Sequence, residues 1–579
     1  MATSIKPFLR DLWALARPYW FSEERRSARM LLAWIIALNL GVIYVNVEMN
    51  QWQNAFFNSL QDRNQAEFLR LLIKFCWLAA AYIIMAVYAF YLRQLLQIRW
   101  RRWLTEKYLN EWLDGRMYYR LQLTDRGTDN PDQRIAEDLR LFADLTLTYT
   151  LDLISTVITL ASFFGILWVL SGTLSFMVGA TPVSVPGYLV WVALIYAVAG
   201  TWLTHRIGKP LIRLHYDQQR FEADLRYALV RFRENAEGIA LYHGEADEKR
   251  NFVGRFRDVM ANWWEIMQRR KKLAGFTASY AQVAIIFPYI VVAPRFFSGA
   301  IQLGGLMQTA SAFREVQIAL SWFVDAYARL AEWKATVDRL IGFHNAIERT
   351  RTEARSRPGV AQERGDLGAI ALDDVRLELP DGRVLLGSAS ERFAPGESLL
   401  VTGPSGVGKS TLFRAIAGIW PFGGGRITIP RNARVLFLPQ KPYLQVGSLR
   451  DVMCYPDWSG KFDDAQLQQL LSDCGLPHLA PRLNEQHNWA LELSVGEQQR
   501  IGFCRSLLRK PDWLMMDEAT SALDAASEER LYRLLKERLP QTTIVSIGHR
   551  PALAAFHERK LEFRLAETGE GMMVAPAGA

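Results

Sequence analysis

Long apolar runs fill roughly the first 350 residues of the chain, and charged segments separate them. A helix needs about twenty mainly apolar residues to cross a bilayer. We therefore expect spanning helices at 30–47, 69–92, 147–170, 188–203 and 276–292, with a sixth at 306–330. The sixth contains Arg314, Glu315 and Asp325, so it should face a water-filled cavity or partner helices, or leave the bilayer at its charged end.

Lys and Arg are unevenly distributed between these runs. Segment 171–187 contains neither, whereas segments 93–140 and 205–272 are rich in both. The positive-inside rule then places the N-terminus, both basic segments and the C-terminal part of the chain in the cytoplasm of a cell whose inner (plasma) membrane holds the spans. Six spans satisfy this arrangement. Segment 6–19 mixes aromatic, apolar and basic residues, which predicts either a helix in the cytoplasmic interface or a simple basic lead-in.

The two basic segments read as helices that continue out of the membrane, for example at 100–113 and 221–233. Turn-forming residues interrupt them at 125–132 and at 242–248. Each interruption is typical of a tip where one helix reverses into the next, or of an ordinary surface turn. Their matched placement favours a role in contacting the C-terminal domain.

The pattern changes after about residue 350. Segment 349–368 is polar and holds Pro358, Gly359 and Gly365, which is typical of a linker. Short β-type runs then alternate with helical ones, at 398–402, 435–438, 513–516 and 543–547. This predicts an α/β sheet with its site at the strand ends. We therefore expect a transmembrane domain at 1–348, a linker at 349–368 and an α/β domain at 369–579.

Composition adds two constraints. The net charge of the 579-residue chain is +9, but its basic residues flank apolar segments, so a membrane is a better partner than nucleic acid. The sequence has neither an aromatic RNA-binding box nor Cys/His zinc spacing. The four cysteines form no C-x-x-C pair. We therefore expect isolated reduced thiols, in keeping with a cytosolic domain.

The strongest chemical signal is a glycine-rich loop that follows the expected strand at 398–402. It fits G-x-x-x-x-G-K-[ST] and precedes an expected helix, which is the context that this motif requires. Backbone N–H groups of such a loop surround phosphate oxygens, and the motif lysine and serine reach the β/γ-phosphates and Mg²⁺. The alternative is a chance glycine-rich turn. We expect ATP with Mg²⁺ to bind at Gly403, Pro404, Ser405, Gly406, Val407, Gly408, Lys409, Ser410 and Thr411.

A second signal is the apolar run 513–516, which ends in the carboxylates Asp517 and Glu518. Asp517 is placed to hold the Mg²⁺ shell, and Glu518 to act as the general base on the attacking water. An apolar run ending in Asp-Glu is common and mostly structural when it stands alone. Its position downstream of the phosphate loop strengthens the functional interpretation.

Leu493-Ser-Val-Gly-Glu-Gln-Gln-Arg500, just before that run, resembles the signature of ATP-binding-cassette (ABC) ATPases. The resemblance implies that Ser494 and Gly496 grip the γ-phosphate of an ATP held by a second cassette. Val495 replaces the usual glycine and Glu497 the usual glutamine. The resemblance also implies that Gln440 senses Mg²⁺ and water, that the loop ending at Asp524 crosses a dimer interface, and that His549 contacts the γ-phosphate.

The membrane part resembles SbmA/BacA-type domains and those of peroxisomal ABC-D fatty-acyl transporters, through segments 50–60, 99–104, 130–138 and 234–245, with 437–443 in the cassette. The resemblance implies a multidomain protein that joins an all-α six-helix transmembrane domain of exporter type to an α/β P-loop NTPase domain. It implies an ATP-driven transporter that works as a C2 homodimer in membrane lipid and moves a solute such as a peptide, a cobalamin-like compound or a fatty-acyl derivative.

The alternative function is an ATP-gated membrane sensor or scaffold without pumped cargo, which the substitution at Val495 allows. A nucleic-acid-handling ATPase does not fit, because such proteins lack the spanning helices that we expect here.

Overall fold

The computed structural model describes residues 5–124, 130–178, 181–356, 359–566 and 570–574. The chain divides into two units, each described here by itself. One holds residues Met1–Asn110 and Asn130–His344, and the other holds Glu111–Asp129 and Asn345–Ala579.

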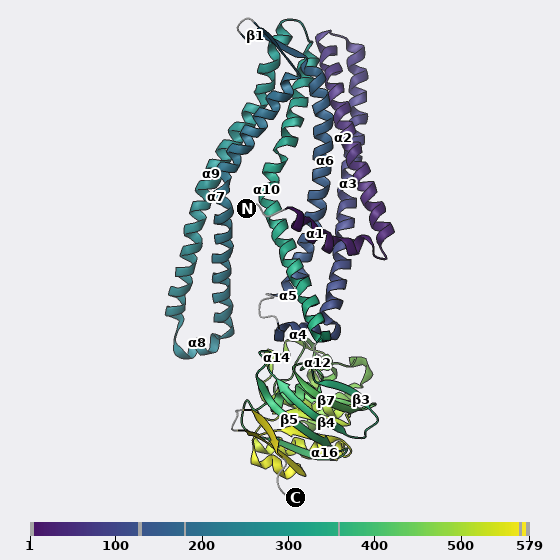
Figure 1. The fold of residues 1–579 in the computed structure, drawn as a ribbon, viewed down its shortest axis with the longest axis vertical. Coiled ribbons are helices and arrows are strands. Elements are labelled where there is room, and N and C mark those ends of the chain that lie inside the picture. The colour runs from purple at the N-terminus through teal and green to yellow at the C-terminus, as the bar shows by residue number, and fades with distance from the viewer. Residues whose placement is uncertain (1–4, 125–129, 179–180, 357–358, 567–569, 575–579) are drawn as a thin grey trace. The chain divides into compact units, whose positions relative to one another are not determined.

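The first unit is built from long helices (Figure 1). They are α1 (Ile5–Trp20), α2 (Arg25–Gln61), α3 (Gln65–Leu113), α6 (Leu139–Ser171), α7 (Tyr188–Glu234), α8 (Ala236–Tyr242), α9 (Glu245–Phe297) and α10 (Leu303–Ser356). Short helical pieces, α5 (Pro131–Gln133) and the π-helical η2 (Arg134–Asp138), lead into α6. The helix predicted at 6–19 is present as α1, and the extensions predicted at 100–113 and 221–233 are parts of α3 and α7.

Five of the described helices are long and apolar enough to cross a membrane, and they contain the first five predicted spans. These five are α2, α3 with its continuation, α6 with its lead-in, α7 and α9. Helix α10 is as long as its neighbours but is not among these five in the described part of the chain, and charged residues such as Arg314 and Glu315 lie in it. The sixth span therefore remains a prediction.

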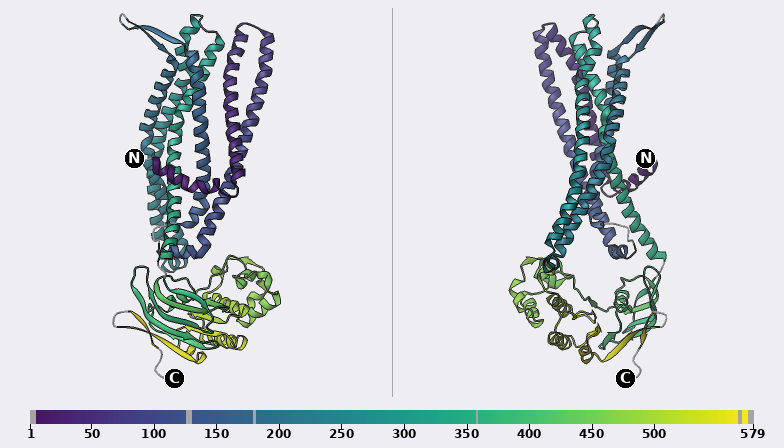
Figure 2. Two further views of the ribbon diagram at one scale, coloured as in Figure 1. Left: turned by 45° about the vertical axis from the view of Figure 1, so that its right-hand side comes forward. Right: turned by 90° about the vertical axis from the view of Figure 1, so that its left-hand side faces the viewer.

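Helices α7 and α9 lie side by side along their length, as both views in Figure 2 show. The chain reverses between them through α8 and a turn in which His243 has a φ of +53°. This is the second predicted tip. Leu241 and Tyr242, at the end of α8, have exposed fractions of 74% and 89%. Such exposed apolar side chains suit contact with another surface.

A feature that the sequence did not predict is the antiparallel hairpin of β1 (Thr173–Val178) and β2 (Thr181–Pro186) between α6 and α7. Arg295, near the end of α9, holds its base by donating hydrogen bonds of 2.7 Å to the carbonyls of Leu170 and Ser171. A cation is well placed there, because the last carbonyls of a helix lack partners within it. In the sequence, this segment stands out only by its lack of basic residues.

An asparagine ladder joins α2 to the first turns of α10. Asn50 donates to the carbonyl of Gln308 (3.0 Å), and Asn54 donates to the Gln308 side chain (2.6 Å). Asn58 donates to Asn54 (2.7 Å) and accepts from the backbone N–H of Gly304 (2.8 Å). The spacing of four residues puts the three asparagines on one helix face. The ladder therefore satisfies a free N–H of α10 and fixes its distance from α2.

The first predicted tip, 125–132, lies mainly outside the described residues, but the helix before it is described. Helix α4 (Met117–Thr124), which follows the 3₁₀ turn η1 (Asp114–Arg116), belongs to the second unit. Arg116 donates a hydrogen bond of 2.8 Å to the carbonyl of Ala417, and Leu123 packs on the core of the α/β sheet. The chain around the tip therefore contacts the C-terminal domain.

The second unit is centred on a sheet of ten described strands, in the order β3-β7-β4-β5-β14-β13-β6-β12-β11-β8. The strands are β3 (Ala361–Gly365), β4 (Ile370–Glu378), β5 (Val384–Phe393), β6 (Ser398–Thr402), β7 (Gly423–Pro430), β8 (Val435–Leu438), β11 (Trp513–Asp517), β12 (Thr543–Ile547), β13 (Arg559–Leu565) and β14 (Gly571–Val574). The four predicted strands are β6, β8, β11 and β12. These four pair in parallel, so their carboxyl ends share one edge.

Helices and a small second sheet complete this unit. The helices are α11 (Lys409–Ile416), α12 (Leu449–Cys454), α13 (Asp464–Asp473), α14 (Trp489–Glu492), α15 (Val495–Arg509) and α16 (Ala525–Arg538), with 3₁₀ turns η3 (Ser459–Lys461), η4 (Pro477–Arg482) and η5 (Pro551–Phe556). The short strands β9 (Gly447–Ser448) and β10 (Gln486–His487) pair with each other. A core of leucine and aromatic side chains packs α12, α13 and α15 together, which makes a helical subdomain beside the sheet.

The predicted linker at 349–368 is mostly regular structure instead. Helix α10 runs on to Ser356, supported by pairs such as Arg351–Glu348 one turn apart (2.5 Å). Strand β3 then pairs with β7 at the edge of the sheet. Its side chains are mostly exposed, so the polar composition that suggested a linker belongs to a solvated edge strand.

Helices α2 and α10 approach closely at Gly304, so we predict that a larger residue there destabilises the protein. A methyl group there would lie 1.9 Å from the carbonyl oxygen of Asn54, so Gly304→Ala should destabilise the membrane part by about 1–3 kcal/mol. We expect a lower midpoint for thermal unfolding of detergent-solubilised protein, followed by tryptophan fluorescence. Gly305→Ala is the control: its methyl group would meet Ile301 at an ordinary 3.5 Å, and alanine favours helix. Equal midpoints for the two variants would contradict this packing.

Candidate functional site

The glycine-rich loop lies between β6 and α11, where the sequence placed it. Gly403, Gly406 and Gly408 have φ values of +144°, +83° and +102°, a region that other residues rarely adopt. Gly403 is also tightly enclosed, since a methyl group there would lie 2.5 Å from the carbonyl oxygen of Phe563. Gly408 precedes α11, so the loop presents the N-terminus of that helix to a ligand.

The ends of the loop connect to β11. The Lys409 ammonium donates to the carbonyls of Gly403 and Pro404, both at 2.7 Å, and so spans the loop. The hydroxyl of Ser410 donates to the Asp517 carboxylate at 2.9 Å. Burial lowers the pKa of Lys409 and raises the pKa of Asp517, and the neighbouring Glu518 carboxylate raises the latter further. A bound polyanion and a divalent cation would favour the charged forms of both groups.

Glu518 stands at the centre of the predicted catalytic residues. Its φ of +49° is strained, and its N–H donates to the carbonyl of Ile547 at the end of β12. The Gln440 amide donates to Glu518 Oε2 at 3.2 Å. His549 Nε2 lies 3.3 Å from Glu518 Oε1. The structure thus brings together the three side chains predicted to be catalytic, from the ends of β8, β11 and β12.

The residues present fit Mg²⁺. Magnesium usually takes one or two protein oxygens and keeps the rest of its shell for water and substrate phosphates. Ser410 and Asp517 offer adjacent oxygens, and Gln440 uses its nitrogen for Glu518, which leaves its amide oxygen for the shell. Among the described residues, no group of three or more His, Cys, Asp or Glu side chains forms an all-protein metal site.

The signature residues form a second group. Ser494 caps α15 in a capping box: its side chain accepts from the backbone N–H of Glu497, and the Glu497 carboxylate accepts from the Ser494 backbone N–H at 2.9 Å. Gly496 lies against the loop before α16, where a methyl group would be 3.2 Å from the carbonyl oxygen of Ala522. Val495 is half exposed, so its side chain is accommodated without entering the core.

That loop ends at Asp524, which caps α16 by accepting from the N–H of Ser527 at 2.9 Å. Hydrogen bonding to this N–H lowers the pKa of Asp524. Two residues that the sequence did not indicate hold the same loop. Arg550 donates to the carbonyls of Leu523 (2.7 Å) and Ser521 (3.1 Å).

The other is Gln499, only 1% exposed, on the inner face of α15. Its side chain donates to the Gln440 carbonyl (2.9 Å) and to the Ser521 hydroxyl (3.2 Å), and accepts from the Ala522 N–H (3.1 Å). Gln499 thus links the signature helix to the loops of both groups. The one sequence signal for it is a polar residue at a position of α15 that faces the core.

The membrane unit contains a cavity of about 1190 Å³ between α6 with its lead-in, α7, α9 and α10. Both signs of charge line it. The basic residues include Lys209, Arg226 and Arg339, and the acidic ones include Asp138, Glu222 and Glu332. Arg339 and Arg134 both contact the buried Asp138, at 2.6 and 2.8 Å. A cavity of this size and polarity suits a polar ligand.

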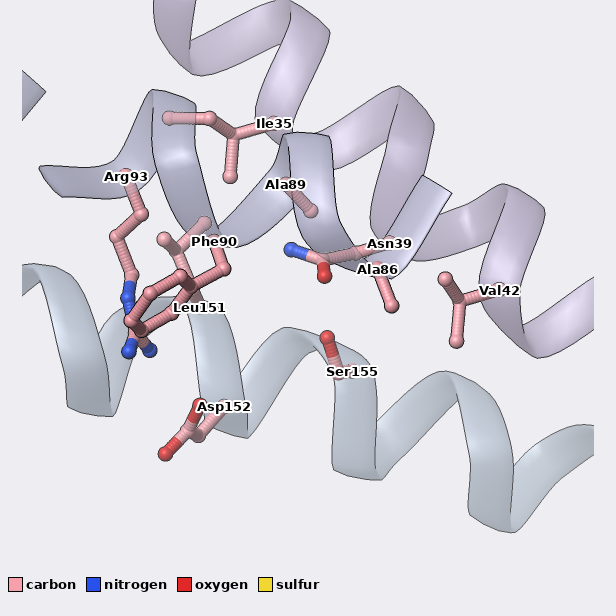
Figure 3. A pocket seen from close by; sticks show the side chains of 10 residues that line it. All are labelled: Ile35, Asn39, Val42, Ala86, Ala89, Phe90, Arg93, Leu151, Asp152 and Ser155. Carbon is pink, nitrogen blue, oxygen red and sulfur yellow. The ribbon is translucent and has the colours of Figure 1, made fainter. Parts of the chain in front are cut away.

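A smaller cavity, of about 180 Å³, lies between α2, α3 and α6 (Figure 3). Asn39, Arg93, Asp152 and Ser155 come from all three helices and lie around it together with apolar side chains. Asn39 and Asp152 fall inside predicted spans, and Arg93 follows one directly. Polar groups at such depth are costly in lipid and mark functional positions.

Comparisons with known proteins agree with this geometry. Residues 15–297 match the family model for ABC transporter transmembrane region 2, and residues 386–521 match the ABC transporter model. The chain is 35% identical over 552 residues to the inner membrane ABC transporter ATP-binding protein YddA of Escherichia coli, covering 95% of this chain and 96% of that protein. The chain belongs to the ABC transporter family. The protein is therefore an ATP hydrolase that couples hydrolysis to transport of a solute across a membrane.

A second relative and a solved structure are also similar to this chain. It is 32% identical over 635 residues to ABC transporter D family member 2, chloroplastic, of Arabidopsis thaliana, covering 98% of this chain and 87% of that protein. Its fold matches a bacterial Atm1-family ABC exporter solved with ATP bound, at a TM-score of 0.67 and 17% identity, covering 94% of both chains. The predicted fold class, a helical membrane region of exporter type fused to an α/β ATPase domain, is thereby confirmed.

From the position of Lys409 in the phosphate loop, we predict that its substitution weakens nucleotide binding. Lys409→Ala removes the ammonium that spans the loop, and a lost hydrogen bond to a charged group costs about 1.5–3 kcal/mol. We expect ATP affinity to fall roughly ten- to hundredfold in titrations with a fluorescent nucleotide. Lys536→Ala, at an exposed position on α16, should bind like the unchanged protein. Unchanged affinity for Lys409→Ala would remove Lys409 from the phosphate site.

Proposed function

We propose that this ABC transporter works as a C2 homodimer with an SbmA/BacA-type membrane domain in the inner (plasma) membrane. Its N-terminus and its ATPase domain lie in the cytoplasm, and membrane lipid surrounds its spans. Its membrane domain covers residues 1–348, a linker covers 349–368, and the ATPase domain covers 369–579. The E. coli relative, whose name places it in the inner membrane, supports this location. The basic segments between the spans support the orientation.

The main support for a dimer is that the site residues form two groups. One group surrounds the phosphate loop: Lys409, Ser410, Gln440, Asp517, Glu518 and His549. The other surrounds the N-terminus of α15: Ser494, Gly496 and the loop to Asp524. A helix N-terminus attracts anions, so the second group is suited to a γ-phosphate held by the first group of another copy. Two copies related by a twofold axis then complete two sites.

In this arrangement each site residue has a role. The loop Gly403–Thr411 holds the phosphates of ATP, with Lys409 on the β/γ-phosphates. Ser410, Gln440 and Asp517 hold Mg²⁺, which supplies charge neutralisation to the phosphoryl group when bound. Glu518 accepts the proton of the attacking water, and His549 orients Glu518 and contacts the γ-phosphate. Asp524 and the loop before it lie at the interface between the copies.

Closure of the cassettes would reach the membrane through the cytoplasmic tips. The contact of Arg116 with Ala417 already joins η1, just before α4, to the cassette. The exposed Leu241 and Tyr242 at α8 offer a second apolar contact surface. ATP drives the change only if it binds the closed state more tightly than the open one.

For the cargo we propose a polar solute, such as a hydrophilic peptide or a cobalamin-like compound, rather than a fatty-acyl derivative. The single observation behind this choice is the mixed charge of the large cavity, where Lys209, Arg226, Glu222 and Glu332 can pair with charges on a ligand. An acyl chain would leave these groups desolvated and unpaired, which is costly.

The role of Glu518 is tested with Glu518→Gln in proteoliposomes. The amide keeps the shape of the side chain but cannot accept the proton, so ATP turnover should fall by roughly a hundredfold or more while ATP still binds. Steady-state ATP-driven transport should stop. Glu537→Gln, at an exposed position of α16, should leave turnover unchanged. Undiminished uptake by Glu518→Gln would rule out Glu518 as the base.

The cargo class is tested by the effect of solutes on ATP hydrolysis by reconstituted protein. A transported polar solute should raise the ATPase rate. If Lys209 and Arg226 both bind it, the Lys209→Ala, Arg226→Ala double variant should need an about tenfold or higher solute concentration for half-maximal stimulation. Stimulation by acyl derivatives alone would contradict the proposed cargo. If no solute changes the rate, an ATP-gated sensor without cargo becomes the better description.

A further inference from the structure

A histidine outside the motifs lies directly behind the signature turn. His478, in η4, has its Nε2 3.0 Å from Oε1 of Glu497 in α15. Oε2 of the same carboxylate accepts from the Ser494 backbone N–H at 2.9 Å and from the Ser494 hydroxyl at 2.8 Å. The Glu497 carboxylate is therefore fixed at both oxygens, by the signature serine on one side and by His478 on the other.

This arrangement has a consequence for phosphate binding at the turn. The hydroxyl proton of Ser494 is directed to Glu497, so the hydroxyl can donate to a phosphate only by leaving the carboxylate. The carboxylate also places a negative charge beside the position that would receive a γ-phosphate, and like charges repel. The hydrogen bonds from Ser494 and the contact with His478 lower the pKa of Glu497, which keeps it ionised.

A glutamine at position 497 would neither repel a phosphate nor require the Ser494 hydroxyl proton, because an amide carries no net charge and can donate as well as accept. The glutamate therefore needs a group that draws its charge away from the phosphate. His478 is placed to do so: it lies on η4, outside the signature turn, and contacts the oxygen that Ser494 does not use. It is 56% exposed at its side chain, so its role does not come from filling the core.

We propose that His478 is a positioning residue for the ATP sandwich. It holds the Glu497 carboxylate toward η4 and offsets its charge, so that Ser494 and the N–H groups at the start of α15 can turn to a γ-phosphate. This inference rests on the proposed function, in which the signature turn binds the nucleotide held by a second copy.

A double-mutant cycle in the full-length, reconstituted protein tests it. The variants are His478→Ala, Glu497→Gln and their combination, and the readouts are kcat and KM for ATP together with nucleotide affinity at the phosphate loop. His478→Ala should lower kcat/KM about tenfold, because a charged hydrogen bond that keeps a carboxylate away from a phosphate is lost. Nucleotide affinity of the phosphate loop should stay within twofold. In the Glu497→Gln background, His478→Ala should change kcat/KM less than twofold.

Controls separate this role from a merely structural one. His487→Ala removes another half-exposed histidine, whose glutamate neighbours Glu485 and Glu492 lie 3.3 and 3.4 Å away, and it should leave kcat/KM unchanged. His478→Gln should recover part of the loss, since its amide can still donate to Glu497. If His478→Ala lowers the unfolding midpoint, His478→Phe, which keeps a ring but cannot donate to Glu497, replaces it in the cycle.

The outcomes also distinguish this inference from the function that it rests on. Equal losses from His478→Ala with glutamate and with glutamine at position 497 would overturn the charge-offsetting role. A large loss from Ser494→Ala without any from His478→Ala would overturn the His478 proposal and leave the proposed sandwich standing. If Ser494→Ala also leaves kcat/KM unchanged, the proposed use of the signature turn fails, and the role of His478 fails with it.

Discussion

The parallel pairing of β6, β12, β11 and β8 decides where the chemistry of this protein takes place. Register fixes the partners: Asp517 pairs with Ile547, and Ile547 in turn with Val401, so the residues that follow these strands meet at one edge. The phosphate loop follows β6, His549 follows β12 and Gln440 follows β8, while the two carboxylates lie at the end of β11. A one-residue slip would turn the side chains of a strand to the other face of the sheet and separate these groups. The mostly buried side chains of these strands hold that register in place.

In the proposed dimer, this edge supplies one half of each site, and the second half belongs to a different part of the domain. Helix α15 carries the signature turn, and its buried inner face joins the helical subdomain to the sheet through Gln499. Gln499 contacts Gln440, Ser521 and Ala522. A shift of α15 therefore changes both the loop that holds Gln440 and the loop that ends at Asp524. Side chains in one hydrogen-bonded network respond together rather than singly. In the proposed dimer, this glutamine links the two groups of residues that bind the nucleotides of different copies.

The sequence could indicate which residues meet at this edge because they belong to short motifs with fixed neighbours. The strand before Gly403, the apolar run before Asp517 and the position of His549 after Ile547 all specify local structure, and local structure is what periodicity reports. The sequence could not indicate His478, Gln499 or Arg550, since each acts through a partner distant along the chain or through a buried face. The regular structure within 349–368 was not predicted for a related reason: a solvated edge strand and a charged helix end have the composition of a loop. The hairpin after Ser171 was not predicted, because its two strands of six residues each are short beside the long apolar runs on either side.

The membrane unit follows a different physical rule, because a bilayer removes the hydrophobic gain from helix association and leaves hydrogen bonds and close packing to select partners. The ladder of Asn50, Asn54 and Asn58 uses both: it satisfies the start of α10 and brings Gly304 against the α2 backbone. Helix α10 carries charged residues such as Arg314 and Glu315, which lipid would penalise, and the ladder ties it to α2, which is long and apolar enough to cross a membrane. Its charged residues are then free to face the large cavity, where Glu332 and Arg339 lie. A polar cavity wall is thus compatible with a stable membrane unit because a neighbouring helix, rather than lipid, holds that wall in place.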